Sequence, residues 1–152
     1  MSEAARSPVR LQLCTMAHNG SSRAVGVGRV LIAVYAVLAL AATARSLVQI
    51  VTKFEVAPVA YLLSGLAGIV YVVATIALLG RGPVWYRVAW ITICFELLGV
   101  LVIGFLSVLD PVLFPADTVW SYFGRGYLFI PLVLPVLGIL WLVRTRPAAS
   151  VP

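Results

Sequence analysis

The feature that most constrains this chain is an apolar stretch from Val88 to Leu109 whose single charged residue is Glu96. Its 22 residues are enough to cross a bilayer as a helix, which takes about 20 residues. A carboxylate in such a helix costs roughly 3 kcal/mol when it lies at the centre of a membrane. At helical spacing Glu96 shares one stripe with residues that are mostly small or polar, namely Thr92, Gly99, Ile103 and Ser107. This stripe predicts a face that packs against other protein, with Gly99 as a helix-packing position.

The composition extends the membrane assignment to the rest of the chain. Hydrophobic residues make up 62% and charged residues 11% of the 152 residues, whereas an average globular chain is about one quarter charged. We therefore expect an all-α membrane protein with four transmembrane helices in an antiparallel bundle and no second domain. The excess of Arg over Lys, together with abundant Ala and Val, is typical of a high-GC bacterial genome.

Apolar runs separated by turn residues predict the four spans and the tails. The expected spans are residues 27–51, 58–79, 88–109 and 127–143, within a transmembrane domain of residues 25–146. Residues 1–24 show no helical periodicity, so they predict a disordered cytoplasmic tail, in which Met16 is an alternative start. Residues 147–152 form a second expected cytoplasmic tail.

Two prolines predict an irregular fourth span. Pro131 fits the first turn of a helix, where no backbone N–H is needed, whereas Pro135 would be interior. Because an interior proline removes one helical hydrogen bond, Pro135 predicts a kink.

The basic residues predict the orientation. Eight of the 11 Lys and Arg residues lie in the N-terminal region, the turn between the second and third spans, or the C-terminal region. Basic residues concentrate on the cytoplasmic side of membrane proteins, so we expect a multi-pass protein of a bacterial inner membrane with both termini in the cytoplasm. The charges lie at the ends of apolar segments and not in one patch, which argues against nucleic acid as a partner.

The second span carries the residues expected to meet Glu96. Ser64, Gly68, Tyr71 and Thr75 recur at intervals of three or four residues, and Ser64 with Gly68 forms a pair of small residues that allows close helix packing. At about 1.5 Å per residue, Tyr71 lies level with Glu96. We therefore predict a hydrogen bond from the Tyr71 hydroxyl to the Glu96 carboxyl.

Arg45, near the outer end of the first span, has two possible positions. Its long side chain either reaches the lipid head groups or turns inward to pair with a buried group. The sequence leaves both open.

Two functional classes remain open. In the first, Glu96, Tyr71, Ser64 and Thr75 form a polar clasp between helices of a non-enzymatic structural or accessory component, which acts through contacts with copies of itself or with another membrane protein. In the second, the chain is a small proton-coupled transporter, working as a homodimer, with Glu96 as the ion site and the kinked helix providing movement.

An enzyme, a cofactor site and a metal site are not expected. The spans contain one acidic residue and no histidine, so they lack a paired nucleophile and base. The two cysteines, Cys14 and Cys94, belong to no Cys/His cluster.

The chain is similar in size to the small multidrug resistance exporters, which also hold a glutamate in the membrane. The glutamate of that family lies in its first helix, and the expected first span of this chain contains no acidic residue. The exporters' activity is therefore not carried over, and no family motif is recognised.

Overall fold

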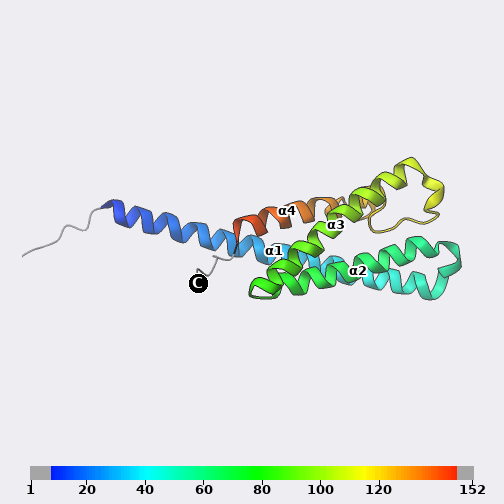
Figure 1. Ribbon diagram of the computed structural model, residues 1–152, viewed down its shortest axis with the longest axis horizontal. Coiled ribbons are helices and arrows are strands. Elements are labelled where there is room, and N and C mark those ends of the chain that lie inside the picture. Colours follow the sequence, from blue (N-terminus) through cyan, green and yellow to red (C-terminus); the bar gives the residue numbers. More distant parts are fainter. Residues whose placement is uncertain (1–7, 147–152) are drawn as a thin grey trace, which may run out of the picture.

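The chain is described by a computed structural model over residues 8–146, with side chains placed over 26–112 and 114–146. Within these residues every regular element is helical. The elements in chain order are α1 (Pro8–Lys53), η1 (Phe54–Val56), α2 (Pro58–Leu79), α3 (Pro83–Leu109), η2 (Pro111–Leu113), η3 (Ser121–Tyr127) and α4 (Ile130–Arg144), where η denotes a 3-10 helix. Consecutive α-helices run in opposite directions (Figure 1).

Three segments are long and apolar enough to cross a membrane by themselves, namely residues 26–56, α2 and α3. The pair of η3 and α4 reaches that length only together, and it is bent by 98° at the break between them. The prediction of an all-α protein is therefore confirmed, and three to four of its described helices are long and apolar enough to span a membrane. The predicted fourth span is not a single straight helix, and a fourth crossing exists only if η3 and α4 together count as one broken span.

The observed helix ends agree with the predicted spans for α2 and α3, but α1 begins much earlier than the first predicted span. The second expected span coincides with α2, and the third ends where α3 ends but begins five residues later than Pro83. Helix α1 continues back to Pro8, through residues 8–24 that the sequence analysis assigned to a disordered tail. The stretch contains Leu11, Gln12, Leu13, Met16 and Ala17, which favour helix, and proline is well tolerated in a first helical turn. Residues 1–7 and the expected tail 147–152 lie outside the described residues.

Helices α1 and α2 form an antiparallel pair with the most extensive contact among the described elements (Figure 1). Small residues are frequent on the buried faces of the two helices: Ala39 and Ala42 of α1 and Ala60, Ala67, Ala74 and Ala77 of α2 are buried. A Cβ atom added to Gly68 would lie 2.8 Å from Thr43 Oγ1 and 3.2 Å from the Thr43 backbone nitrogen. Gly68 therefore lets the two backbones approach closely, which agrees with its predicted packing role.

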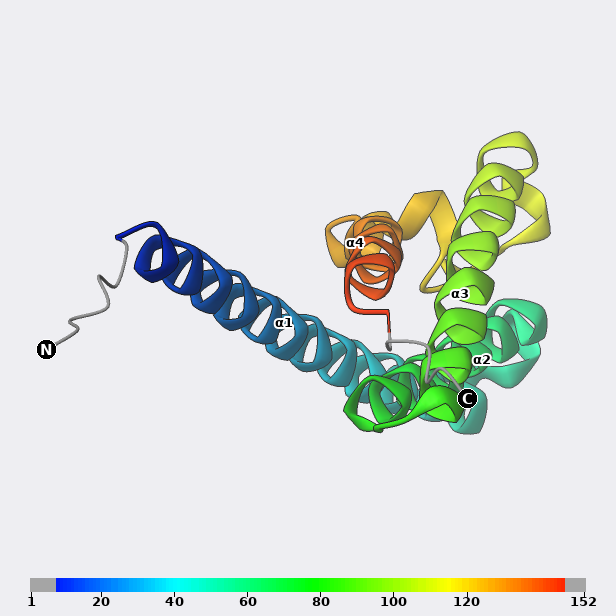
Figure 2. The same ribbon diagram turned by 60° about the vertical axis from the view of Figure 1, so that its left-hand side comes forward.

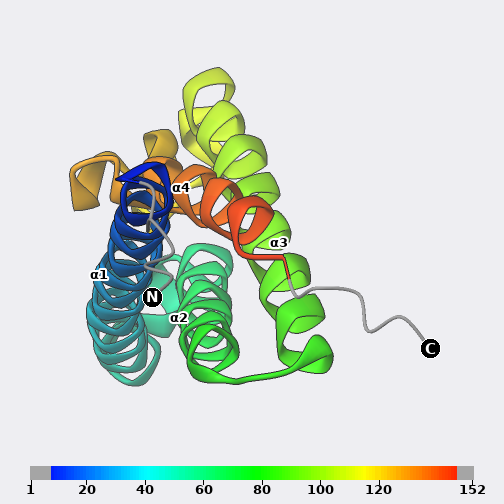
Figure 3. The same cartoon turned by 90° about the vertical axis from the view of Figure 1, so that its left-hand side faces the viewer.

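Helix α4 packs against α3 and α1 (Figure 3). Figure 2 shows the first part of α1 extending away from the other helices. With 15 residues, α4 is about 22 Å long and is shorter than the hydrocarbon core of a bilayer, which is about 30 Å. It begins at Ile130 and not at Tyr127, because Leu128 and Phe129 have left-handed backbone angles (φ 55° and 58°) that end the preceding helical turn.

Residues 114–129, which we call the re-entrant segment, fold back along α3 toward the middle of the molecule (Figure 1). Trp120 lies against Gly99 and Phe123 lies against Gly104, in both cases where a Cβ atom on the glycine would clash with the ring. At about 1.5 Å per residue, Gly99 is about 15 Å from the Leu109 end of α3. Irregular backbone at such depth is tolerated only where protein or a wet cavity surrounds it, and Trp120 is 2% exposed. The packing role predicted for Gly99 is thus toward this segment and not toward another helix.

Candidate functional site

Glu96 lies on the interior face of α3 and is 0% exposed. The same face buries Ile93, Val100, Ile103 and Ser107. The stripe predicted from helical spacing therefore faces the interior at Glu96 and at the positions that follow it. A carboxyl group removed from water and lipid needs hydrogen-bond donors from the surrounding protein.

The donor is Tyr35 of α1, whose hydroxyl donates to Glu96 Oε2 at 2.7 Å. Tyr35 is itself 0% exposed, so this bond joins α1 to α3 inside the protein. The predicted bond from Tyr71 to Glu96 is therefore wrong. Tyr35 lies about 6 Å and Glu96 about 4 Å to the same side of the midpoints of their expected spans. The two residues thus lie at similar depth in the first and third expected spans, and this similarity is the signal in the sequence for the Tyr35–Glu96 pair.

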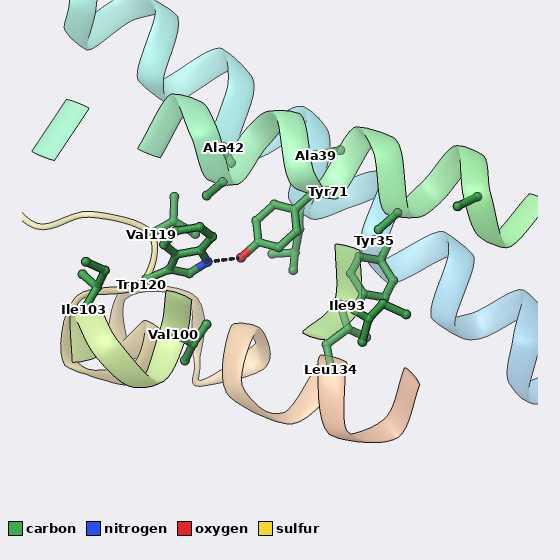
Figure 4. Close-up of a cluster of buried hydrophobic side chains, with 14 of the residues drawn as sticks. Tyr35, Ala39, Ala42, Tyr71, Ile93, Val100, Ile103, Val119, Trp120 and Leu134 are labelled. Atoms are coloured by element: carbon green, nitrogen blue, oxygen red, sulfur yellow. Dashed lines mark hydrogen bonds between the residues drawn. The ribbon is translucent and has the colours of Figure 1, made fainter. Parts of the chain in front are cut away.

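Tyr71 is used differently, as an acceptor for the re-entrant segment. Trp120 Nε1 donates to the Tyr71 hydroxyl at 3.1 Å (Figure 4). The rings of Tyr35 and Tyr71 lie side by side, with centroids 6.3 Å apart and a tilt of 53°. Glu96, Tyr35, Tyr71 and Trp120 thus form one buried group, here called the polar cluster. Each of α1, α2, α3 and the re-entrant segment contributes one side chain to it.

One oxygen of the polar cluster has no partner. Glu96 Oε1 is buried and makes no hydrogen bond. An unsatisfied buried polar atom costs about 1–3 kcal/mol, so this position is informative. At this oxygen the carboxyl can carry a proton, or it can accept a hydrogen bond from a group outside the polar cluster.

Ser64 and Thr75 bond within their own helix and do not join a clasp between helices. The Ser64 hydroxyl donates to the Ala60 carbonyl at 2.9 Å, and the Thr75 hydroxyl donates to the Tyr71 carbonyl at 2.7 Å. In apolar surroundings a hydroxyl one turn along a helix readily finds the carbonyl four residues earlier. This local bond prevails over the predicted contact with Glu96.

Arg45 is exposed on α1 and contacts the re-entrant segment. Its guanidinium carbon lies 6.0 Å from the centre of the Tyr127 ring, a distance at which a cation is attracted to an aromatic face. The structure thus gives Arg45 an aromatic neighbour outside the polar cluster, and Arg45 does not pair with Glu96.

Pro131 and Pro135 are both buried in α4. Pro131 lies in the first turn, as predicted. Helix α4 continues through Pro135, and the bend of 98° lies before it, between η3 and α4. The change of direction is thus made by the left-handed residues Leu128 and Phe129, because they end the turn before α4 begins. Pro135 itself removes only the N–H that would bond to the Pro131 carbonyl.

The chemistry of this site is that of one carboxyl, two phenols and one indole. The described residues contain no group of three or more His, Cys, Asp or Glu side chains that could hold a metal ion. No protein-family model, no curated protein and no solved structure matches the chain.

Proposed function

We propose that the protein is a non-enzymatic structural or accessory component of a bacterial inner membrane, with both termini in the cytoplasm. It acts through helix contacts with copies of itself or with another membrane protein. The observation that carries this proposal is the buried hydrogen bond between Tyr35 and Glu96, since it commits the one acidic residue inside the predicted spans to holding α1 and α3 together. The distribution of Lys and Arg supports the orientation.

The surroundings of Glu96 support a structural role. Glu96 and Tyr35 are both 0% exposed. Two cavities lined by described residues, one beside Tyr86 and one beside Arg125, do not include Glu96. The outward faces of α2 and of the middle of α3 are largely apolar, with Leu62, Ile69, Leu98 and Phe105 among the exposed residues, and such faces suit lipid or a partner helix.

The test is purification of the tagged full-length protein from its own membranes in a mild detergent, with determination of the mass and of all co-purifying chains. A stoichiometric second membrane protein, or a stable homo-oligomer without transport activity, supports the proposal. A protein that is monomeric at all concentrations and retains no partner overturns it. Glu96→Gln is the matched control, because the amide oxygen still accepts from Tyr35 and the assembly should be kept.

A second candidate is a small proton-coupled transporter that works as a homodimer with Glu96 as its ion site. Two observations favour it: the unpartnered Glu96 Oε1 and the broken fourth crossing, since interrupted helices often line transporter sites. The measurement is proton-coupled flux in proteoliposomes. Loss of flux in Glu96→Gln at unchanged protein abundance supports transport, and equal flux in both proteins counts against it.

A further inference from the structure

The re-entrant segment lines an open cavity that belongs neither to the polar cluster nor to the contacts between the long helices. Its volume is about 460 Å³, and it is lined by Asp117, Thr118, Ser121, Tyr122, Arg125 and Gly126. Small-molecule sites in proteins are typically about 300–1,000 Å³. All six lining residues come from a single stretch of ten residues, and five of them carry polar side chains.

Two opposite charges line this cavity without neutralising each other. Asp117 and Arg125 are both exposed, and among the described residues no ion pair joins them. Arg125 lies over the Tyr122 ring, with 5.9 Å between the guanidinium carbon and the ring centre. Its N–H donors therefore remain available, as do the carboxylate oxygens of Asp117. A ligand that complements both must carry a positive and a negative group.

The wall of the cavity is fixed before any ligand arrives. Thr118 Oγ1 accepts from the backbone N–H of Trp120 at 3.1 Å and from that of Ser121 at 2.9 Å, and Ser121 Oγ accepts from the Thr118 N–H at 2.9 Å. Thr118 and Ser121 are 4% and 3% exposed. Because these bonds hold the turn, a ligand does not have to order it, and pre-organisation of this kind favours binding.

The backbone beside the cavity is strained. Tyr122 and Phe123 have left-handed angles (φ 50° and 61°), and Gly124 follows with φ 80°. The left-handed region costs a non-glycine residue roughly 1–2 kcal/mol. Residues kept in such conformations cluster at ligand clamps and active sites. Here they turn the chain so that Tyr122 and Arg125 line the same cavity as Asp117.

We propose that this cavity binds a zwitterion with a primary ammonium group and a phosphate, as in phosphoethanolamine. The ammonium donates to the Asp117 carboxylate, and the Arg125 guanidinium donates to the phosphate oxygens, an arrangement suited to the planar fork of arginine. The same group exists as the headgroup of phosphatidylethanolamine and as a free small molecule. The cavity lies in the connection that follows the membrane-length helix α3.

The test is native mass spectrometry of the full-length protein in mild detergent, titrated with phosphatidylethanolamine, phosphatidylglycerol or phosphatidylcholine of the same acyl chains. We expect the first lipid to bind most tightly. Phosphatidylglycerol lacks the cation, and the quaternary ammonium of phosphatidylcholine has no N–H to donate to Asp117. Each charge-assisted hydrogen bond that is removed lowers affinity about tenfold, so Asp117→Asn and Arg125→Gln should each weaken phosphatidylethanolamine binding by about that factor.

Two matched variants serve as controls. Asp110 lies in the same connection, but its carboxylate accepts from the Val112 N–H at 3.1 Å and does not line the cavity. Arg144, at the end of α4, lies outside the cavity. Asp110→Asn and Arg144→Gln should leave binding unchanged. Since all four substitutions fall on exposed residues, thermal unfolding in detergent should show the same stability for each.

Soluble phosphoethanolamine separates the two sources of the ligand. Displacement of the bound lipid by millimolar phosphoethanolamine supports recognition of the group in either molecule. Lipid binding that resists this competitor but is weakened by the two cavity variants supports the lipid as the source. Equal binding of all three lipids, or unchanged binding in Asp117→Asn and Arg125→Gln, overturns the proposal. Each of these results is independent of whether the protein has a membrane partner.

Discussion

Single residues decide the chemistry of the interior, and Glu96 is the clearest case. Its burial follows from the sequence, because an acidic residue in an otherwise apolar span is excluded from lipid. Its partner did not follow, because Tyr35 lies in an unbroken apolar run and Tyr71 lies in a conspicuous polar repeat. The repeat in α2 instead reflects close packing at Gly68 and a bond from Trp120 to Tyr71.

The Tyr35–Glu96 bond predicts a non-additive pair of mutations. Glu96→Leu leaves the Tyr35 hydroxyl buried without an acceptor and should lower stability by about 1–3 kcal/mol, with lower abundance in the membrane. The double variant Tyr35→Phe, Glu96→Leu removes both polar groups and should be more stable than Glu96→Leu alone. Thermal unfolding in detergent measures both effects. Strictly additive losses would show that the two side chains are not coupled.

At the scale of elements, glycines lie where helices and segments pack closely. A second glycine nearby in the sequence serves as the comparison for each such position. Gly68 and Gly65 lie on α2 one turn apart, yet a Cβ atom on Gly68 would meet the α1 backbone at 3.2 Å, whereas one on Gly65 would lie 3.8 Å from its nearest atom. Composition alone treats these two glycines alike. The spacing of Gly68 from Ser64 already points to close packing at Gly68, and the placement of α1 shows how much more space Gly65 has.

We therefore predict opposite effects for alanine at these two positions. Gly68→Ala should force α1 and α2 apart and destabilise the protein by about 1–3 kcal/mol. Gly65→Ala should be neutral or stabilising by up to about 1 kcal/mol, because alanine is the better helix former and the space exists. Midpoints of thermal unfolding compare the two variants directly. Similar midpoints for both would contradict the close approach at Gly68.

The re-entrant segment gives a second matched pair. Gly124 has a φ of 80° and its added Cβ atom would lie 2.8 Å from Pro131, whereas Gly126 has open space around the corresponding position. Gly124→Ala should thus detach the segment from α4 and destabilise the protein, while Gly126→Ala should not. Limited proteolysis between α3 and α4 reports detachment. Equal resistance of the two variants to proteolysis would contradict the observed turn at Gly124.

The sequence explains the three long helices better than it explains this segment. Runs of more than 20 apolar residues allow only one structure in a bilayer, since every backbone group must be satisfied internally. The segment from Phe114 to Phe129 mixes one proline, several hydroxyls and aromatic rings, and its position depends on contacts with Gly99 and Gly104, which are distant in sequence. Its packing along α3 therefore does not follow from the local sequence pattern.

For the whole molecule, the orientation in the membrane can be tested by labelling introduced cysteines from one side. We expect the turn at Arg81 in the cytoplasm and the connection at Asp117 on the opposite side. In intact cells carrying a variant without Cys14 and Cys94, a membrane-impermeant maleimide should label Asp117→Cys, and should label Arg81→Cys only after permeabilisation. Labelling of Arg81→Cys alone in intact cells would reverse the orientation.

The polar cluster also has a consequence for biosynthesis. Its four side chains leave the ribosome in the order Tyr35, Tyr71, Glu96, Trp120. The donor for the carboxylate is therefore already present when the acidic helix α3 reaches the membrane, which reduces the cost of its insertion. Trp120 and then helix α4, which is too short to span a membrane by itself, are synthesised last. Chains that stop before Trp120 lack the last member of the cluster, so they are the forms that a membrane protease should distinguish from the finished protein.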